Sequence, residues 1–231
     1  MKREAAIQLM NETRHSYDQA SGEFSASRAK FWDELAFLLE HTTHDDHVVD
    51  IGCGNGRLFP LVASRHAHYT GIDYSEKLIA EAKHRNPGAT FFIGDATALP
   101  FPDQSFDIAY SFAALHHIPS LALRAQFVKE TARVLPVNGI FVITVWNLWR
   151  AKYFGQLLHD AIGKIFGKNT FDIGDMLLTF GKTKQPRYLH AFTKNELRKL
   201  LESNGFRMQD IDIIPRKSGE ENIVAVARKI N

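Results

Sequence analysis

One buried strand that breaks into three closely spaced glycines constrains the fold of this chain more than any other feature. The segment reads Val48-Val49-Asp50-Ile51-Gly52-Cys53-Gly54-Asn55-Gly56-Arg57. Glycines at alternate positions reach backbone conformations that are closed to residues with a Cβ, and they leave the main chain open to a bound molecule. The pattern therefore predicts a strand followed by a tight turn that holds a nucleoside ligand.

The spacing of the glycines separates two classes of nucleoside cofactor. A dinucleotide-binding turn reads G-x-G-x-x-G and rests a pyrophosphate on the next helix N-terminus. Here the order is G-x-G-x-G, and Arg57 follows the last glycine. A second acidic residue, Asp73, comes about 20 residues after the turn, where parallel α/β folds hold ribose hydroxyls. Together with Asp50, this favours S-adenosylmethionine, which has no pyrophosphate.

Apolar segments of strand type and helix type alternate along most of the chain. The patterns predict strands at 48–51, 69–72, 90–93, 106–112, 140–145, 206–214 and 222–227. They predict helices at 27–40, 57–65, 75–84, 121–135 and 193–204, with Ser75 and Thr193 as N-caps. The expected fold is α/β: a Rossmann-like seven-stranded, mostly parallel sheet with an antiparallel last strand, helices on both faces, an amino-terminal helix and a lid insertion.

The composition is compatible with one domain over residues 1–231. We divide it into an amino-terminal cap (1–45), a cofactor-binding core (46–146), a substrate-side insertion (147–192) and a carboxy-terminal helix with a strand pair (193–231). The single cysteine, Cys53, excludes an internal disulfide, and no segment approaches the roughly 18 apolar residues that cross a bilayer. We therefore expect a cytoplasmic protein with no membrane partner. The formal charge of +2 is too small to identify a partner.

Further polar residues follow the third and fourth predicted strands. Asp95 and Ala96 come directly after 90–93, and Phe112 ends 106–112, at the sheet edge where open α/β folds bind ligands. With the glycine turn and Asp73, this order resembles the class I S-adenosylmethionine-dependent methyltransferases. The resemblance implies that Asp95 receives the adenine amino group and that S-adenosyl-L-homocysteine is the product. The expected cofactor-binding residues are Tyr17, Arg28, Asp50, Gly52, Gly54, Asn55, Asp73, Tyr74, Asp95, Ala96 and Phe112.

A more specific resemblance lies in the segments that flank this core. Before the core the chain has a Y-D…F-S-x-S-R…W series over 17–32, and after it an R-Y-x-H-x-F series over 187–192. An apolar pair precedes His116-His117, and another strand ends in Val145-Trp146. These motifs resemble the tRNA wobble-uridine carboxymethyl methyltransferases over nearly the whole chain. The segment between about 147 and 186 departs from the family pattern.

That family esterifies a carboxymethyl group on the wobble uridine of tRNA. A carboxylate with a pKa near 4 is already ionised at neutral pH, so it needs no general base. Catalysis would then consist mostly of placing the carboxylate oxygen behind the methyl group. Arginine or a His–Tyr pair suits a site that holds a carboxylate. The candidate catalytic residues are Arg28, His116, Arg187, Tyr188 and His190.

Basic and aromatic residues alternate between Trp146 and Phe192, as in surfaces that bind single-stranded RNA. The basic residues of this segment are Arg150, Lys152, Lys164, Lys168, Lys182, Lys184 and Arg187. The apolar residues of 154–166 also recur at helical spacing, which equally predicts a packed lid helix. The sequence leaves both readings open, with tRNA as the expected partner.

Alternative functions fit the same core. A small-molecule methyltransferase acting on a carboxylic acid, a quinone or a similar acceptor is compatible with it, because a fold does not determine a substrate. A non-catalytic cofactor-binding subunit is a third reading. The family resemblance also implies a possible small activator protein. We expect no metal site, because the adjacent His116 and His117 point apart, and no catalytic thiol at Cys53, because no base motif accompanies it.

Overall fold

The computed structural model describes residues 1–28, 30–165, 171–180 and 185–230, so Lys168, Lys182 and Lys184 lie outside the described residues. A seven-stranded sheet in the order β3-β2-β1-β4-β5-β9-β8 forms its centre. Neighbouring strands pair in parallel from β3 to β5, whereas β9 and β8 are antiparallel. This confirms the expected fold class. The strands are β1 (His47–Ile51), β2 (His68–Asp73), β3 (Thr90–Ile93), β4 (Ile108–Phe112), β5 (Ile140–Trp146), β8 (Phe206–Pro215) and β9 (Glu221–Lys229).

Helices cover both faces of this sheet. Because successive side chains of a strand point to opposite faces, Val48 of β1 packs into one layer and Val49 into the other. The layer around Val49 includes α5 and α7, and the layer around Val48 includes η1, α3 and α4. The bounds are η1 (Asp33–His41), α3 (Phe59–Ala63), α4 (Glu76–Arg85), η2 (Leu115–His117), α5 (Leu121–Val134) and α7 (Lys194–Glu202).

Two helix starts follow the predicted caps. The Ser75 hydroxyl accepts a hydrogen bond from the Leu78 amide at 3.2 Å, and the Thr193 hydroxyl accepts one from the Glu196 amide at 3.1 Å. Each cap satisfies a backbone donor that the first turn leaves unpaired, which stabilises a helix by about 1 kcal/mol. The Ser75 cap also fixes the chain just after the end of β2.

The prediction of one helix over 27–40 is correct only from residue 33 onward, where the chain forms a 3₁₀ helix. The chain forms α1 (Arg3–Gln19), α2 (Ser21–Ser27) and this 3₁₀ helix, η1. Arg28 ends α2, and Trp32 has an extended backbone with φ −75° and ψ 118° before η1 begins. Residues 28 and 30–32 therefore lie outside any helix.

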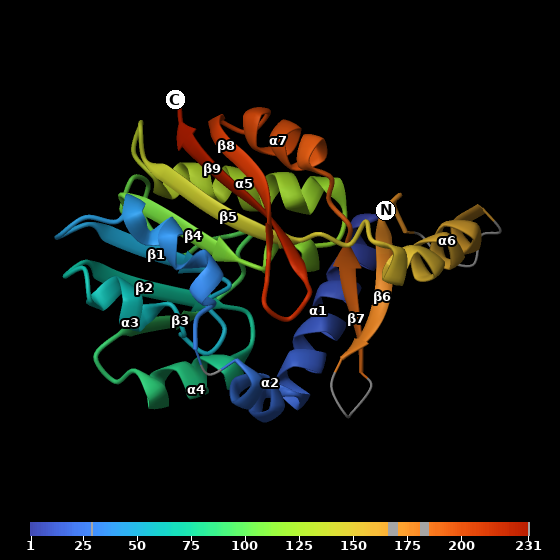
Figure 1. Cartoon of the computed structure of the whole chain (residues 1–231), viewed down its shortest axis with the longest axis horizontal. Coiled ribbons are helices and arrows are strands. Elements are labelled where there is room, and N and C mark those ends of the chain that lie inside the picture. Colours follow the sequence, from blue (N-terminus) through green and yellow to red (C-terminus); the bar gives the residue numbers. More distant parts are fainter. Residues whose placement is uncertain (29, 166–170, 181–184, 231) are drawn as a thin grey trace.

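The insertion expected after β5 contains the helix that the apolar spacing predicted and, in addition, a hairpin that was not predicted. It contains α6 (Ala151–Ile165) and a hairpin of β6 (Asp175–Phe180) and β7 (Gln185–His190). Helix α1 packs against β7: the Ser16 hydroxyl donates to the Pro186 carbonyl at 2.7 Å, and the Tyr188 amide donates to the Thr13 hydroxyl at 3.2 Å. Figure 1 shows α1, α6 and the hairpin grouped on one side of the sheet. Within the described part of the chain, no helix is long and apolar enough to cross a membrane.

Candidate functional site

A cavity lies where the parallel strands end, between the glycine turn and helices α1 and α2. Its lining comes from the ends of β1, β2, β3 and β4 and from the amino-terminal segment. All eleven residues expected to bind the cofactor line this one cavity: Tyr17, Arg28, Asp50, Gly52, Gly54, Asn55, Asp73, Tyr74, Asp95, Ala96 and Phe112. Segments far apart in the sequence thus converge on a single site.

The glycine turn has the backbone that its sequence requires. Gly52, Gly54 and Gly56 have φ values of +79°, +56° and +73°, in the region that side chains with a Cβ rarely adopt. The Gly52 amide donates to the Ile72 carbonyl at 2.8 Å, which ties the turn to the end of β2. A Cβ on Gly52 would collide with the Cβ of Ala114. The turn is therefore fixed in shape and leaves the main chain open beside the cavity.

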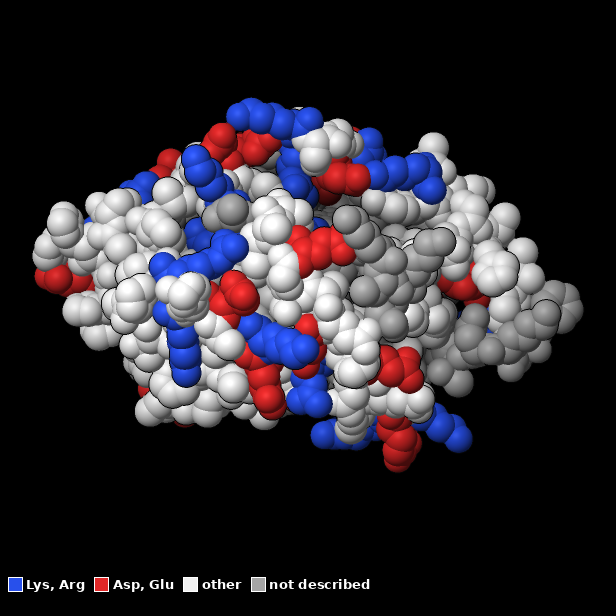
Figure 2. Space-filling view, turned by 90° about the horizontal axis from the view of Figure 1, so that it is seen from below, with Lys and Arg blue, Asp and Glu red and all other residues white. Residues whose placement is uncertain are grey.

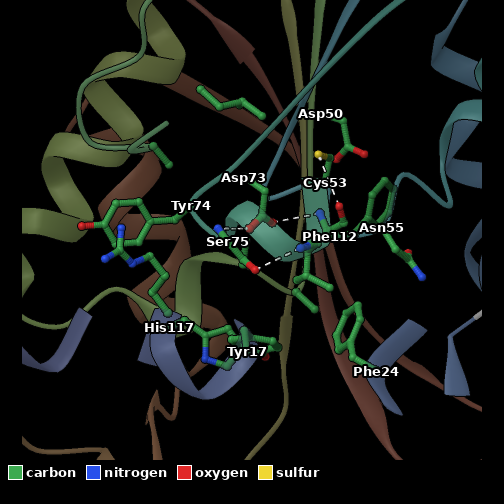
Figure 3. A pocket seen from close by; sticks show the side chains of 18 of the residues that line it. Tyr17, Phe24, Asp50, Cys53, Asn55, Asp73, Tyr74, Ser75, Phe112 and His117 are labelled. Atoms are coloured by element: carbon green, nitrogen blue, oxygen red, sulfur yellow. Dashed lines mark hydrogen bonds between the residues drawn. The ribbon is translucent and has the colours of Figure 1, made fainter. Parts of the chain in front are cut away.

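Asp73 connects the glycine turn to the start of α4 on the cofactor side of the cavity. Its two carboxylate oxygens accept hydrogen bonds from the Gly54 amide and the Ser75 amide, each at 2.8 Å (Figure 3). Burial raises the pKa of Asp73, and both amides oppose that effect. The carboxyl group is therefore oriented by the glycine turn on one side and by the start of α4 on the other.

Asp50 and Cys53 are buried beneath the turn. Asp50 is 3% exposed, and its carboxylate accepts a hydrogen bond from the Tyr69 hydroxyl at 2.8 Å. Burial raises the pKa of Asp50 to about 7. Burial also raises the pKa of the Cys53 thiol, so this sulfur stays protonated and is a poor nucleophile.

The cavity fits an adenosyl cofactor by its chemistry. Asp73 and Asp95 present carboxylates from neighbouring strands, and such acceptors suit ribose hydroxyls and an adenine amino group. The Asp95 oxygen Oδ1 accepts both the Thr97 amide and the Thr97 hydroxyl at 2.8 Å, which fixes its orientation. The aromatic ring of Phe112 adds an apolar wall. Gly54 also lines the cavity, and the Phe24 ring lies 3.5 Å from the place where a Cβ would stand.

A hydrogen-bonded chain joins Tyr17, His117 and Arg187 at the side of the cavity that faces α1. The His117 nitrogen Nδ1 lies 3.0 Å from the Tyr188 carbonyl, which only accepts, so Nδ1 carries the proton. The Tyr17 hydroxyl then donates to the His117 nitrogen Nε2 at 2.8 Å and accepts from Arg187 Nη1 at 3.2 Å. Burial and the nearby Arg187 lower the pKa of His117 to about 3, so this imidazole is neutral at physiological pH.

Aromatic rings support the two expected arginines. The Arg28 guanidinium lies 4.5 Å from the centre of the Phe24 ring, and that of Arg187 lies 4.8 Å from the Trp146 ring. Burial is the main cause of the lowered pKa of Arg28, and Arg187 contributes to it. Arg28 lines the cavity, whereas Arg187 reaches it through Tyr17.

The other three expected catalytic residues do not line the cavity. Tyr188 and His190 alternate with Arg187 along β7, so they point to the opposite face, where both bond to the buried Asp175. His116 is fully buried, and its Nδ1 accepts the Trp146 amide at 3.4 Å. His117, rather than His116, lines the cavity. The His-His pair signalled a histidine here, but adjacent residues point apart and the motif does not say which one faces inward.

Comparisons with known proteins agree with this geometry. A family model described as a methyltransferase domain matches residues 49–143. The protein named "Putative methyltransferase" in Encephalitozoon cuniculi is 32% identical over 215 residues, which cover 92% of this chain and 93% of that protein. The tRNA (carboxymethyluridine(34)-5-O)-methyltransferase of Schizosaccharomyces pombe is 29% identical over 211 residues, covering 86% of this chain and 90% of that protein.

One solved structure shows a similar architecture. A SAM-dependent methyltransferase from Methanosarcina mazei is 27% identical, has a TM-score of 0.74, and matches 87% of this chain and 99% of its own. Several other curated relatives are much longer, and this chain spans only about a third of their length. The similarity to them therefore concerns one part of a larger protein.

Proposed function

This chain belongs to the S-adenosylmethionine-dependent methyltransferases, and from that premise we propose that it esterifies the carboxyl group of a 5-carboxymethyl-type uridine at the wobble position of tRNA. The observation that carries the proposal is the acceptor side of the cavity. There, Arg28 and the Tyr17–His117–Arg187 chain place positive charge beside a neutral histidine. This arrangement suits an acceptor that arrives as an anion.

The residues supply charge and orientation rather than a base. The His117 lone pair on Nε2 is occupied by the Tyr17 hydroxyl, so His117 does not accept a proton from the acceptor. An acceptor that needs no deprotonation is a carboxylate, which is ionised at neutral pH. An alcohol acceptor would require a base in reach; the carboxylates of the lining are Asp50, Asp73 and Asp95, which we assign to the cofactor side.

Arg28, which lines the cavity, would then hold the acceptor carboxylate, and Arg187 would add positive charge from behind Tyr17. A guanidinium presents several N–H donors in one plane and matches a carboxylate by two parallel hydrogen bonds. Packing against Phe24 and Trp146 limits the rotation of the two side chains, so little conformational freedom is lost on binding. Tyr17 fixes the position of Arg187 through its hydroxyl.

Asp73, Asp95 and the glycine turn would hold S-adenosylmethionine, which would supply a methyl group on a positively charged sulfur. A carboxylate oxygen would bond to the methyl carbon as the carbon–sulfur bond breaks, with its electron pair staying on sulfur. No proton moves in this step. The chain contributes by aligning the oxygen with the methyl group, for which oriented reactants gain a large rate advantage.

The relatives support tRNA as the acceptor, since a similar protein that matches over most of both chains is named as a tRNA carboxymethyluridine methyltransferase. A small-molecule carboxylic acid is the second candidate, because Arg28, with the charge of Arg187 behind Tyr17, would hold it equally well. The expected small activator protein stays a prediction.

Nucleoside mass spectrometry of tRNA from cells lacking the protein tests the proposal. The methyl ester of 5-carboxymethyluridine should disappear and the free acid should accumulate. The wild-type chain should restore the ester, as should Arg198→Ala, which removes an exposed arginine of α7. Unchanged ester levels in the deletion strain would exclude the tRNA function. Labelled methyl entering a metabolite extract but not tRNA would favour the small-molecule candidate.

A further inference from the structure

A second cleft adjoins the cofactor cavity and shares one wall with it. Phe31, Trp32, Asn55 and Arg57 line both spaces. On the far side of this wall the cleft is lined by the basic residues Lys30 and Arg85 together with Asn86, Ala36, Pro60 and Leu61. We call this space the Trp32 cleft. It shares Asn55 with the expected cofactor site, but Arg57 and the residues on its far side have no role in the cofactor or carboxyl sites described above.

Two arginines from distant parts of the chain pack on the indole of Trp32. The Arg57 guanidinium, directly after the glycine turn, lies 3.7 Å from the ring centre. The Arg216 guanidinium, from the turn between β8 and β9, lies 4.3 Å from it. Stacking occupies the face of a guanidinium and leaves the N–H donors in its plane available. Arg57 lines the cleft, and Arg216, which is not among the lining residues, lies beside it against the same indole.

Acidic groups influence this pair only from a distance: Asp50 acts on Arg57, and Glu34 and Glu220 act on Arg216. Within the part of the chain that the structure describes, no carboxylate lies within ion-pair distance of Arg57 or Arg216. Asp33, the acid that lines the cleft, pairs with Lys217 at 3.2 Å, and Glu34 accepts the Lys217 amide at 2.6 Å. Glu220 pairs with Lys152. The neighbouring acids are therefore already engaged.

The same arginines carry buried donors without acceptors. Nη1 of Arg57 and Nε of Arg216 are buried and have no hydrogen-bond partner among the described residues. Burial, with Arg28 and Arg216 nearby, lowers the pKa of Arg57 to about 9. A buried charged donor without a partner is unfavourable, and a bound anion that accepts its hydrogen bond would remove that cost.

We propose that the Trp32 cleft binds a phosphodiester group of the tRNA next to the nucleotide whose base enters the cofactor cavity. This inference rests on the proposed function. Arg57 and Arg216 would donate to the phosphate oxygens, and Lys30 would add charge at the rim. Each nucleotide of an RNA chain is joined to a phosphate. When the base lies in the cofactor cavity, on one side of the shared wall, a neighbouring phosphate would therefore lie at the edge of the Trp32 cleft on the other side.

The positive charge of the Trp32 cleft belongs to a few side chains and is not part of a broad basic surface. On the face shown in Figure 2, Lys and Arg side chains are interleaved with Asp and Glu, so no broad area of that face has a single sign. Phosphate contacts fix the register of a nucleic acid without reading its sequence. A single phosphate held at Trp32 would thus set the distance between the RNA backbone and the methyl group.

A double-mutant cycle between protein and RNA tests the proposal. The probe is an anticodon stem-loop with 5-carboxymethyluridine, in which one phosphate beside that nucleotide is either normal or an uncharged methylphosphonate. Arg216→Gln is the principal variant, because Arg216 does not line the cofactor cavity. Arg207→Gln is the matched control, because Arg207 is an exposed arginine near the other end of the same hairpin.

Wild type and Arg207→Gln should each bind the methylphosphonate probe about ten-fold more weakly than the normal one. Arg216→Gln should bind both probes equally and lower the slope of log affinity against log salt by about 1. Arg216→Lys, which keeps the charge, should retain the wild-type slope. Calorimetry should show wild-type affinity for S-adenosylmethionine in every variant.

The proposal would be overturned if methylphosphonate substitution, tried at each of the two neighbouring phosphates, weakened binding by the same factor in wild type and in Arg216→Gln. Failure of the proposed function gives a different result, since the wild-type enzyme would then leave the stem-loop unmethylated. The binding cycle needs no turnover, so the phosphate site is judged by it in either case: a loss of coupling in Arg216→Gln supports the site, and unchanged coupling rejects it.

Discussion

Asp50 makes the stability of this protein depend on pH in a direction that is unusual for a carboxyl group. Burial raises the pKa of Asp50 from 3.8 to about 7 in the folded state. Between these values the folded protein holds one more proton on Asp50 than the unfolded chain does. Its stabilising contribution is therefore fully present below pH 4 and is lost as the pH rises through 7. The difference corresponds to about 4 kcal/mol as an upper limit.

Asp50→Asn removes this dependence and keeps a side-chain oxygen that accepts the Tyr69 hydroxyl. The free energy of unfolding, measured with urea without cofactor from pH 4 to pH 8, should fall less steeply in the variant. Between pH 4 and pH 8, the free energy of unfolding of the variant should therefore rise relative to that of wild type by about 2–4 kcal/mol. Asp210→Asn, which removes an exposed carboxyl of β8, should follow the wild-type curve. Parallel curves for Asp50→Asn and wild type would refute the reasoning.

Further substitutions test the cofactor side, the acceptor side, the glycine turn and the buried Asp175 separately. Asp73→Ala should abolish cofactor binding in calorimetry, whereas Arg187→Ala should spare it and lower methyl transfer; equal loss of binding in both would remove Arg187 from the acceptor side. Gly52→Ala should lower the free energy of unfolding by about 1–2 kcal/mol or more, because the φ of Gly52 is +79° and the added Cβ would meet Ala114. Gly22→Ala is the control: open space surrounds Gly22, so this substitution should not destabilise the protein. Asp175→Asn should cost about 3–5 kcal/mol in thermal or urea unfolding, because Arg124, Tyr188 and His190 all depend on this buried carboxylate; a loss below 1 kcal/mol would contradict that role.

The middle of the central sheet was predictable because strands such as β4 and β5 are nearly continuous apolar runs. β3 begins and ends at the expected residues, 90 and 93, and the caps Ser75 and Thr193 form as expected. The cofactor side of the site followed from the same strands, since parallel strands end at one edge of the sheet.

The amino-terminal helices were not predictable from hydrophobic periodicity. The buried face of α1 consists of Ala6, Met10, Thr13 and Ser16, two of which are polar, so the helix lacks a clear apolar stripe. The hydroxyls of Thr13 and Ser16 are buried because they bond to the backbone of β7. Such partners are visible only once the hairpin is in place.

The acceptor side was predictable as a segment but not as individual side chains. The R-Y-x-H-x-F motif indicated 187–192, yet on a strand its residues alternate between two faces, and only Arg187 reaches Tyr17. Tyr188 and His190 instead join Asp175 within the protein. The apolar residues near 154–162 indicated a helix, and α6 is that helix, but nothing in the sequence indicated the hairpin beside it.

The fate of the transferred methyl group tests the central claim most directly. tRNA that contains 5-carboxymethyluridine is incubated with the protein and labelled S-adenosylmethionine, and the product is then treated with mild alkali. A methyl ester hydrolyses under these conditions, so the label should leave the RNA as volatile methanol. Label that remains on the RNA after this treatment would place the methyl on a base nitrogen, a base carbon or a ribose oxygen, and would contradict transfer to a carboxylate.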